Sequence, residues 1–178
     1  MPELIDVLDE NGVKTGRVVT RKEVHREGLW HQIAVVVVLD DSGRILLQQR
    51  SANKETNPGK WDIAAAGHVD AGEDSLSTAK REAEEELGIV ADDLQYLLSY
   101  CRESHYECNG EPLVDRQRFD CYVMRKTHID VDTLQLQSSE VQSVKLCTIT
   151  EFRKMIEFGE MVNRMPLYEK VIEIMEQR

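Results

Sequence analysis

The residues best suited to chemistry are three glutamates, Glu82, Glu85 and Glu86. In a helix, their spacing of three and four positions would place the three carboxylates on one face. Like charges at this spacing repel one another, and hard divalent cations with oxygen ligands, above all magnesium, fit such a cluster best. The sequence therefore predicts a metal-binding helix face, against the alternative of a solvated acidic surface helix.

The segment around these glutamates has the features of a helix that runs from Ser75 to Leu87. Gly72 permits a tight turn before the helix, and Asp74 or Ser75 can cap its first N–H groups. Gly88 is the expected C-terminal stop. Apolar residues recur at spacings of three and four and predict the stripe that packs on the core: Leu76, Ala79, Ala83 and Leu87.

Two further residues near this helix have the types that such a site needs. Gly67 follows a run of three alanines, and its lack of a side chain allows the backbone to pass close to a metal or a phosphate. Arg81 lies beside the carboxylate face. We expect Arg81 to pair with Glu73 and so to hold the preceding loop against the helix.

Length and composition are those of one globular domain spanning residues 1–178. The chain has 33 acidic and 22 basic residues among 178, a formal net charge of −11. This charge argues against binding nucleic acid through its phosphate backbone, which requires patches of lysine and arginine. It does not exclude small phosphorylated substrates, because a bound metal reverses the local sign.

The start of the chain lacks the basic and apolar regions of a signal peptide, and the longest apolar run, 33–39, is too short to span a membrane. We therefore expect a cytoplasmic protein with no membrane partner. Its oligomeric state is open, with a homodimer as one option. Cys101, His105 and Cys108 do not have the spacing of a recognised zinc site. The four cysteines are expected to be free thiols: Cys101, Cys108, Cys121 and Cys147.

The rest of the chain predicts strands, the glutamate helix, further strands and two final helices, which favours a mixed sheet between helical layers. The β-branched run from Ile33 to Leu39 is expected to be a central strand buried on both faces. A polar segment ending at Gly28 is expected to be a short helix, and Trp61 to Ala66 a short strand. The other predicted elements are strands 4–8 and 15–20 (an N-terminal hairpin), 44–49, 94–106, 114–124 and 141–147, a loop 107–112, and helices 150–158 and 167–177.

The glutamate segment also resembles a known family. Gly67, Glu73 and the run from Arg81 to Ile89, separated by five and seven residues, resemble the Nudix box with no position missing. The resemblance covers roughly residues 33–158 and implies an α/β/α sandwich with a mixed β-sheet, with the N-terminal β-hairpin and a C-terminal helix as additions. It also implies a hydrolase that cleaves a diphosphate linkage in a nucleoside diphosphate derivative or a related small molecule.

The same resemblance implies roles for individual residues. One to three magnesium or manganese ions would be held by Glu82, Glu85 and Glu86, with the Gly67 carbonyl as an optional further ligand. One of these glutamates, or Glu140 before the strand 141–147, would be the general base, and Arg81 would support the site. Arg50, Lys54 and Lys60 lie in the loop before Trp61 and are candidates for contacts with phosphate oxygens.

A narrower resemblance concerns isopentenyl-diphosphate isomerase, which shares this fold. The isomerase has a cysteine where this chain has Ala66, and two later glutamates where this chain has Asp115 and Gln117. Because Ala66 can neither give nor take a proton, isomerisation is the less favoured alternative. A Nudix-fold binding domain without catalysis is the other alternative, and it would not need an intact carboxylate set. Three histidines of the shared motifs are expected to be structural or hydrogen-bonding rather than metal ligands: His25, His31 and His68.

Overall fold

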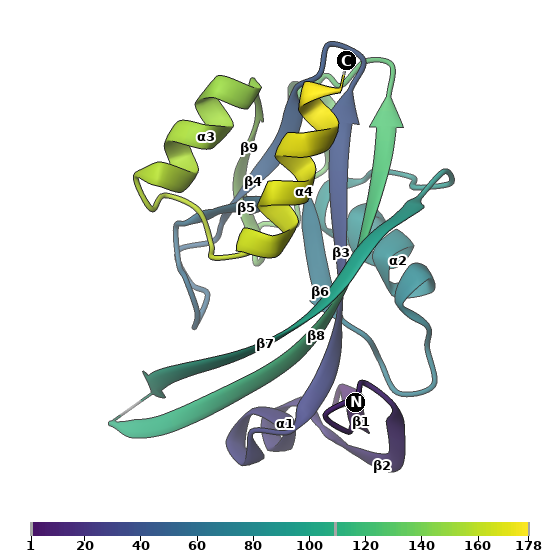
Figure 1. Cartoon of the computed structure of the whole chain (residues 1–178), viewed down its shortest axis with the longest axis vertical. Helices are drawn as coiled ribbons and strands as arrows, with labels where there is room; N and C mark the ends of the chain where they lie inside the picture. The colour runs from purple at the N-terminus through teal and green to yellow at the C-terminus, as the bar shows by residue number, and fades with distance from the viewer. Residues whose placement is uncertain (1, 109, 178) are drawn as a thin grey trace.

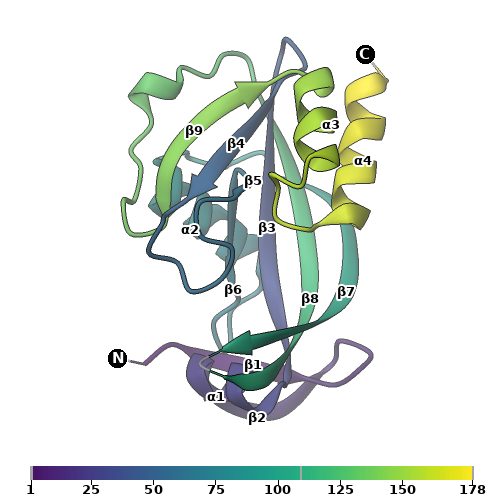
Figure 2. The same ribbon diagram turned by 90° about the vertical axis from the view of Figure 1, so that its left-hand side faces the viewer.

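The computed structural model describes residues 2–108 and 110–177. Within them, nine strands form one mixed sheet, with α2 on one face and α3 and α4 on the other (Figures 1 and 2). The elements are β1 (Leu4–Leu8), β2 (Lys14–Thr20), α1 (Arg21–Glu27), β3 (Trp30–Asp40), β4 (Ile45–Arg50), β5 (Trp61–Ile63), β6 (Ala65–His68), α2 (Ser75–Leu87), β7 (Gln95–Cys108), β8 (Glu111–Lys126), the short 3-10 helix η1 (Val131–Thr133), β9 (Val141–Cys147), α3 (Ile149–Glu157) and α4 (Met165–Glu176).

Strand β3 is the centre of the sheet, as its β-branched run predicts. Successive side chains of a strand point to opposite faces. Ala34, Val36 and Val38 accordingly pack with α2, whereas Val35 and Val37 pack with α3 and α4. All five are fully buried. The predicted strand buried on both faces and the predicted α/β/α sandwich are therefore confirmed.

The two edges of β3 carry different partners. One edge pairs in parallel with β8 over the whole strand, and β8 pairs in turn with β7. On the other edge β3 pairs with β6, whereas β4 meets β3 only at Leu39 and Ile45 and then leads away to β5 and β9. The segment from Trp61 to Ala66 was predicted as one strand, and this is wrong. It splits at Ala64, because β5 and β6 belong to different branches of the sheet.

Most predicted elements are confirmed, with shifts of a few residues at their ends. The N-terminal hairpin is β1 and β2, and α1 ends before Gly28, whose φ of 61° is the left-handed conformation that glycine adopts readily. Helices α3 and α4 and strand β9 occupy the predicted segments, with Pro166 in the first turn of α4. The predicted loop 107–112 includes Asn109, which lies outside the described residues.

Helix α2 has the predicted bounds but a different buried face. The Asp74 side chain accepts a hydrogen bond from the Ser77 N–H at 3.0 Å, and Gly88 closes the C-terminus with φ 68°. The predicted apolar stripe is wrong at Leu76, which is 37% exposed. Glu86 is buried instead, together with three residues of the predicted stripe: Ala79, Ala83 and Leu87.

Three of the cysteines are free thiols, Cys101 at the surface and Cys121 and Cys147 in the core, and the side chain of Cys108 is outside the described part of the chain. Among the described helices, none has the length and apolar content needed to cross a bilayer.

Candidate functional site

The three glutamates of α2 that were predicted to share one face lie in three different environments. Glu86 is buried and accepts a hydrogen bond from the Gln48 amide on β4 at 2.9 Å. Glu82 is partly buried, and Glu85 is exposed. The predicted carboxylate face therefore extends from solvent at Glu85 to the sheet at Glu86.

Burial makes the inner two carboxylates hard to ionise. It raises the pKa of Glu86 to about 8, and the neighbouring charge of Glu82 adds to this effect. Burial likewise raises the pKa of Glu82 to about 7, although the Arg81 guanidinium acts in the opposite direction. Few positive groups offset the charges of these two carboxylates. A bound cation would therefore stabilise their ionised forms, because an opposite charge favours ionisation.

Gly67 on β6 lies against the carboxylate of Glu82. A Cβ atom built at Gly67 would be 2.1 Å from Cδ of Glu82, far inside van der Waals contact. Only glycine therefore allows the β6 backbone and the Glu82 carboxylate to approach one another. The group that approaches Gly67 is thus the Glu82 carboxylate, and the predicted approach of the Gly67 backbone to a metal or a phosphate stays a prediction.

Arg81 connects the outer carboxylates with the preceding loop. Its Nη2 lies 3.2 Å from Glu73 Oε2, which is the predicted pair. Its Nη1 lies 2.8 Å from Glu82 Oε1 and 3.4 Å from Glu85 Oε2. Arg81 thus neutralises part of the charge of Glu73, Glu82 and Glu85. The partner of Glu86 is instead the Gln48 amide.

Glu140, the candidate from the later part of the chain, joins this site from the other branch of the sheet. Its carboxylate forms an ion pair with Lys54, and its carbonyl accepts a hydrogen bond from the Ser51 N–H at 2.8 Å. The Glu140 charge also contributes to the raised pKa of Glu86, so the two carboxylates are electrostatic neighbours.

The three basic residues of the loop before β5 have different partners. Lys54 joins the site through Glu140. Arg50 donates to the Thr56 carbonyl of its own loop at 2.9 and 3.2 Å, and its Nη1 lies 3.9 Å from Asp62 Oδ2. Lys60 donates to the carbonyl of Gly159 at 3.3 Å, between α3 and α4. The structure therefore brings Lys54 to the site, places Arg50 against its own loop and near Asp62, and directs Lys60 away from the site.

The donor types are those that a hard divalent cation prefers. Glu82, Glu85 and Glu86 offer carboxylate oxygens, Gly67 offers a carbonyl, and the Glu82 carboxylate occupies the space that a Cβ at Gly67 would fill. Magnesium and manganese prefer such oxygen ligands.

A second group with metal-binding geometry lies at the start of β3. Ring nitrogens of His25, His31 and His68 all lie within 4.8 Å of one another, and Asp115 Oδ1 lies 3.2 Å from His25 Nδ1. Burial lowers the pKa of His31 to about 4 and that of His68 well below its usual value, so both rings are neutral near pH 7. His31 Nδ1 donates a hydrogen bond to the Leu29 carbonyl at 3.0 Å, and His25 Nε2 shares one with His68 Nε2 at 3.2 Å, so these histidines make hydrogen bonds as predicted.

Sequence reasoning missed the charged residues on the α4 side of the site. Asp62 on β5 is almost fully buried and receives two hydrogen bonds from Arg164, at 2.7 and 2.8 Å. The available sequence signal for Asp62 was its position in a strand among buried residues. No sequence signal marked Arg164, which lies 102 positions further along the chain.

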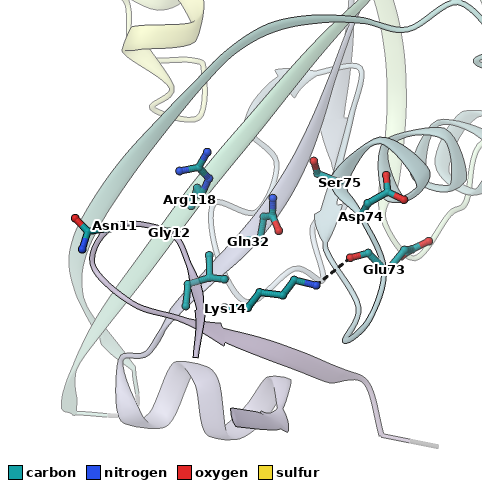
Figure 3. A pocket seen from close by; sticks show the side chains of 9 residues that line it. Asn11, Gly12, Lys14, Gln32, Glu73, Asp74, Ser75 and Arg118 are labelled. Carbon is teal, nitrogen blue, oxygen red and sulfur yellow. Dashed lines mark hydrogen bonds between the residues drawn. The ribbon is translucent and has the colours of Figure 1, made fainter. Parts of the chain in front are cut away.

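A hollow of about 440 Å³ lies beside the N-terminal end of α2 (Figure 3). Lys14 and Arg118 line it opposite Glu73 and Asp74, and Lys14 Nζ donates to the Glu73 carbonyl at 3.3 Å. Its opposite charges are balanced, and none of the three α2 glutamates lines it.

The sequence matches the profile of the NUDIX domain over residues 29–165. The chain belongs to the Nudix family. Its relatives include "Nudix hydrolase 3" of Arabidopsis thaliana, 36% identical over 86% of this chain, which spans about a fifth (20%) of that plant protein. An uncharacterised Nudix hydrolase of Listeria monocytogenes is 32% identical over 88% of this chain and 86% of its own length. An isopentenyl-diphosphate Δ-isomerase of Serratia proteamaculans is 34% identical over 56% of this chain and 55% of its own.

Solved structures have the same fold. The crystal structure of a Deinococcus radiodurans protein, DR0079, superposes with a TM-score of 0.72 at 19% identity and covers 95% of this chain and 97% of its own. The NUDIX domain of Shewanella oneidensis NrtR, crystallised with ADP ribose, superposes with a TM-score of 0.58 at 19% identity and covers 80% of this chain and 86% of its own. The family and the sandwich expected from the Nudix box are therefore confirmed.

Proposed function

We propose that this protein is a magnesium- or manganese-dependent hydrolase that cleaves the diphosphate linkage of a nucleoside diphosphate derivative or a related small molecule. The single observation that carries the proposal is the pair of buried carboxylates, Glu82 and Glu86, one turn apart on α2, of which Glu82 lies against the glycine backbone at Gly67. Such a pair favours a cation, and a cation beside a diphosphate is what this hydrolysis needs. Small-molecule substrates of this kind suit the family, since one fold neighbour was crystallised with ADP ribose.

In this proposal the ligands are the Gly67 carbonyl, Glu82, Glu85 and Glu86. The bound ion would neutralise phosphate charge and lower the pKa of an attacking water. Arg81 keeps Glu73, Glu82 and Glu85 in position when the ion is absent. Arg81 would give up its contacts with Glu82 and Glu85 where these two carboxylates hold an ion.

Lys54 and Glu140 have a joint role in the proposal. They pair with each other in the absence of substrate. Phosphate oxygens bind Lys54, with Arg50 beside it, and release the Glu140 carboxylate, which can then accept a proton from the attacking water.

The isomerase alternative is weaker because the position before Gly67 is Ala66. The two positions that hold the later glutamates in the isomerase are occupied here by residues with other partners. Asp115 contacts His25, and Gln117 accepts a hydrogen bond from Arg102 at 3.1 Å. A non-catalytic binding domain is weaker because such a domain does not need three carboxylates at one cation site.

A release assay tests the proposal. The protein is incubated with a panel of nucleoside diphosphate derivatives and with isopentenyl diphosphate, with magnesium or with EDTA. We expect magnesium-dependent cleavage of at least one nucleotide derivative and no interconversion of isoprenoid isomers. Tight binding of a nucleotide without turnover would favour the binding domain, and isomerised product would favour the isomerase.

A further inference from the structure

On the opposite face of the sheet, two arginines and a tyrosine carry buried polar atoms that lack partners among the described residues. These atoms are Nη1 of Arg164, Nε of Arg102 and the hydroxyl of Tyr100. A buried donor without a partner costs free energy, so native structures normally satisfy it with protein, water or a ligand. The Arg164 guanidinium interacts with the Tyr100 hydroxyl and acts to lower its pKa. The unpaired donors that point to a partner absent from the chain itself are therefore those of the two guanidinium groups.

The three side chains converge on the ring of Phe119. The guanidinium carbons of Arg102 and Arg164 lie 4.9 and 5.3 Å from the centroid of that ring. The Tyr100 ring stacks on Phe119 with centroids 4.7 Å apart. We call these three residues, Tyr100, Arg102 and Arg164, the arginine cluster.

The arginine cluster has more positive than negative charge. Asp62 neutralises Arg164 through two hydrogen bonds. Arg102 instead bonds the Asn163 carbonyl and the Gln117 amide oxygen, and no described carboxylate lies within ion-pair distance of it. Burial and the charge of Arg164 both lower the pKa of Arg102, as expected for a cation without a counterion. The side chain of Arg164 is only 7% exposed, so water screens this excess charge weakly.

Asp62 links the arginine cluster to the carboxylate site. Its carboxylate binds Arg164 and lies 3.9 Å from Nη1 of Arg50, which precedes the loop whose Lys54 pairs with Glu140. Helix α4 begins beside β7 here, and its N-terminal end adds positive potential at Arg164 (Figure 2). An anion at the arginine cluster would therefore be a second group of the molecule whose diphosphate lies at Glu82 and Glu86.

We propose that the arginine cluster is a subsite for a phosphate or carboxylate group that the substrate carries in addition to its scissile diphosphate. This rests on the proposed hydrolase function and narrows its substrate class to diphosphates with a further anionic group. Guanidinium groups bind both anions through charge-assisted hydrogen bonds. An isoprenoid tail has no such group and would leave the unpaired donors of both guanidinium groups unsatisfied.

A binding experiment in EDTA tests the subsite without catalysis. Thermal unfolding of the full chain is measured with sodium phosphate, with sodium acetate, and with sodium chloride at equal ionic strength. At about ten times Kd, the preferred anion should raise Tm by roughly 3–6 °C. A larger shift with phosphate identifies a phosphate subsite, and a larger shift with acetate a carboxylate subsite. Equal shifts with all three salts would overturn the proposal.

Two substitutions locate the effect. Arg102→Met should abolish the anion shift without leaving a carboxylate unpaired, and Arg102→Gln provides a second variant that keeps a donor for the Asn163 carbonyl. Arg125→Met, which removes the same charge from an exposed position of β8, should leave the shift intact. An anion shift that persists in both Arg102 variants would place the anion elsewhere and refute the subsite.

Kinetics then connects the subsite with the substrate. Alkyl diphosphates of equal length, ending in a methyl, carboxylate or phosphate group, are compared by kcat/KM. Arg102→Met should reduce the preference for the anionic end roughly tenfold to a hundredfold, through KM, whereas Arg125→Met should not. An unchanged preference would refute the proposal. An Arg102-dependent anion shift in EDTA combined with no hydrolysis of any diphosphate would instead contradict the hydrolase and leave the subsite standing.

Discussion

The two faces of the sheet carry buried charge of opposite sign. On the α2 face, Glu82 and Glu86 have more negative charge than Arg81 compensates. On the α4 face, Arg102 and Arg164 have more positive charge than Asp62 compensates. Uncompensated buried charge is costly, so each face favours a ligand of the sign that it lacks. One molecule with a metal-bound diphosphate and a second anion would satisfy both.

The faces differ in how the chain builds them. The acidic group comes from a single helix, in which Glu82 and Glu86 are four positions apart. The arginine cluster comes from β7 and the start of α4, and its counterion Asp62 comes from β5. Local spacing therefore predicts the first group, and only the tertiary fold creates the second.

The largest expected effect is on turnover. Glu85→Gln and Glu86→Gln should each lower kcat by roughly a hundredfold to a thousandfold, because each removes a charged ligand that stabilises the transition state through the metal. The matched control is Glu84→Gln, an exposed glutamate on the same helix. Steady-state kinetics on the best diphosphate of the panel measures the effect. Turnover equal to that of the control in both variants would remove α2 from the site.

Substitution of Gly67 should have the next largest effect. The Cβ of Gly67→Ala would overlap the Glu82 carboxylate, so we expect a loss of about 1–3 kcal/mol in the free energy of unfolding. Urea unfolding measures it. The double variant Gly67→Ala/Glu82→Ala removes the overlapping atoms and should recover most of that loss relative to Glu82→Ala alone. No recovery would mean that the strain at Gly67 has another source.

The features of the fold that could be predicted from the sequence are those with a local signal. The bounds of α2 follow from Asp74 and Gly88, and the role of β3 follows from its β-branched run, because each signal is local. Leu76 was misplaced because periodicity does not fix the rotation of a helix. Here Gln48, on a distant strand, gives Glu86 a buried partner. The break at Ala64 likewise depends on where β4 leaves β3, which pairing across the chain decides.

The pH dependence of stability should distinguish the acidic face of the sheet from the α4 face. The pKa of Glu86 is about 8 in the folded protein, above its ordinary value of 4.5, so the folded state binds more protons than the unfolded state between these values. The contribution of Glu86 to the stability of the metal-free protein should therefore fall as pH rises, on the order of 2 kcal/mol from pH 6 to pH 8, and Glu82, whose pKa is raised to about 7, should add to the fall.

Urea unfolding in EDTA at several pH values measures this slope. Glu86→Gln should make it shallower and leave the part due to Glu82, whose pKa is raised to about 7. Arg102→Met should leave the slope unchanged, because arginine does not titrate in this range. A slope in Glu86→Gln as steep as in the wild type would assign the excess protons to another group.

The smallest expected effect is the response to magnesium, and it completes the comparison of the two faces. Magnesium binds the folded carboxylate site and has little affinity for the dispersed carboxylates of the unfolded chain. At ten times Kd it should stabilise the fold by about 1.4 kcal/mol, a rise in Tm of roughly 3–6 °C. Sodium chloride at equal ionic strength should not reproduce this rise, because screening supplies no ligand bonds.

The two ligands should act on separate residues. Glu82→Gln/Glu86→Gln should lose the magnesium shift and keep the anion shift, and Arg102→Met should keep the magnesium shift and lose the anion shift. Thermal unfolding of the wild type and both variants, with each ligand alone, measures all six responses. If the glutamate double variant kept the full magnesium shift, the metal would bind elsewhere and α2 would be an ordinary acidic surface helix. If either variant lost both shifts, the faces would form one coupled site, in which each ligand needs the other's residues.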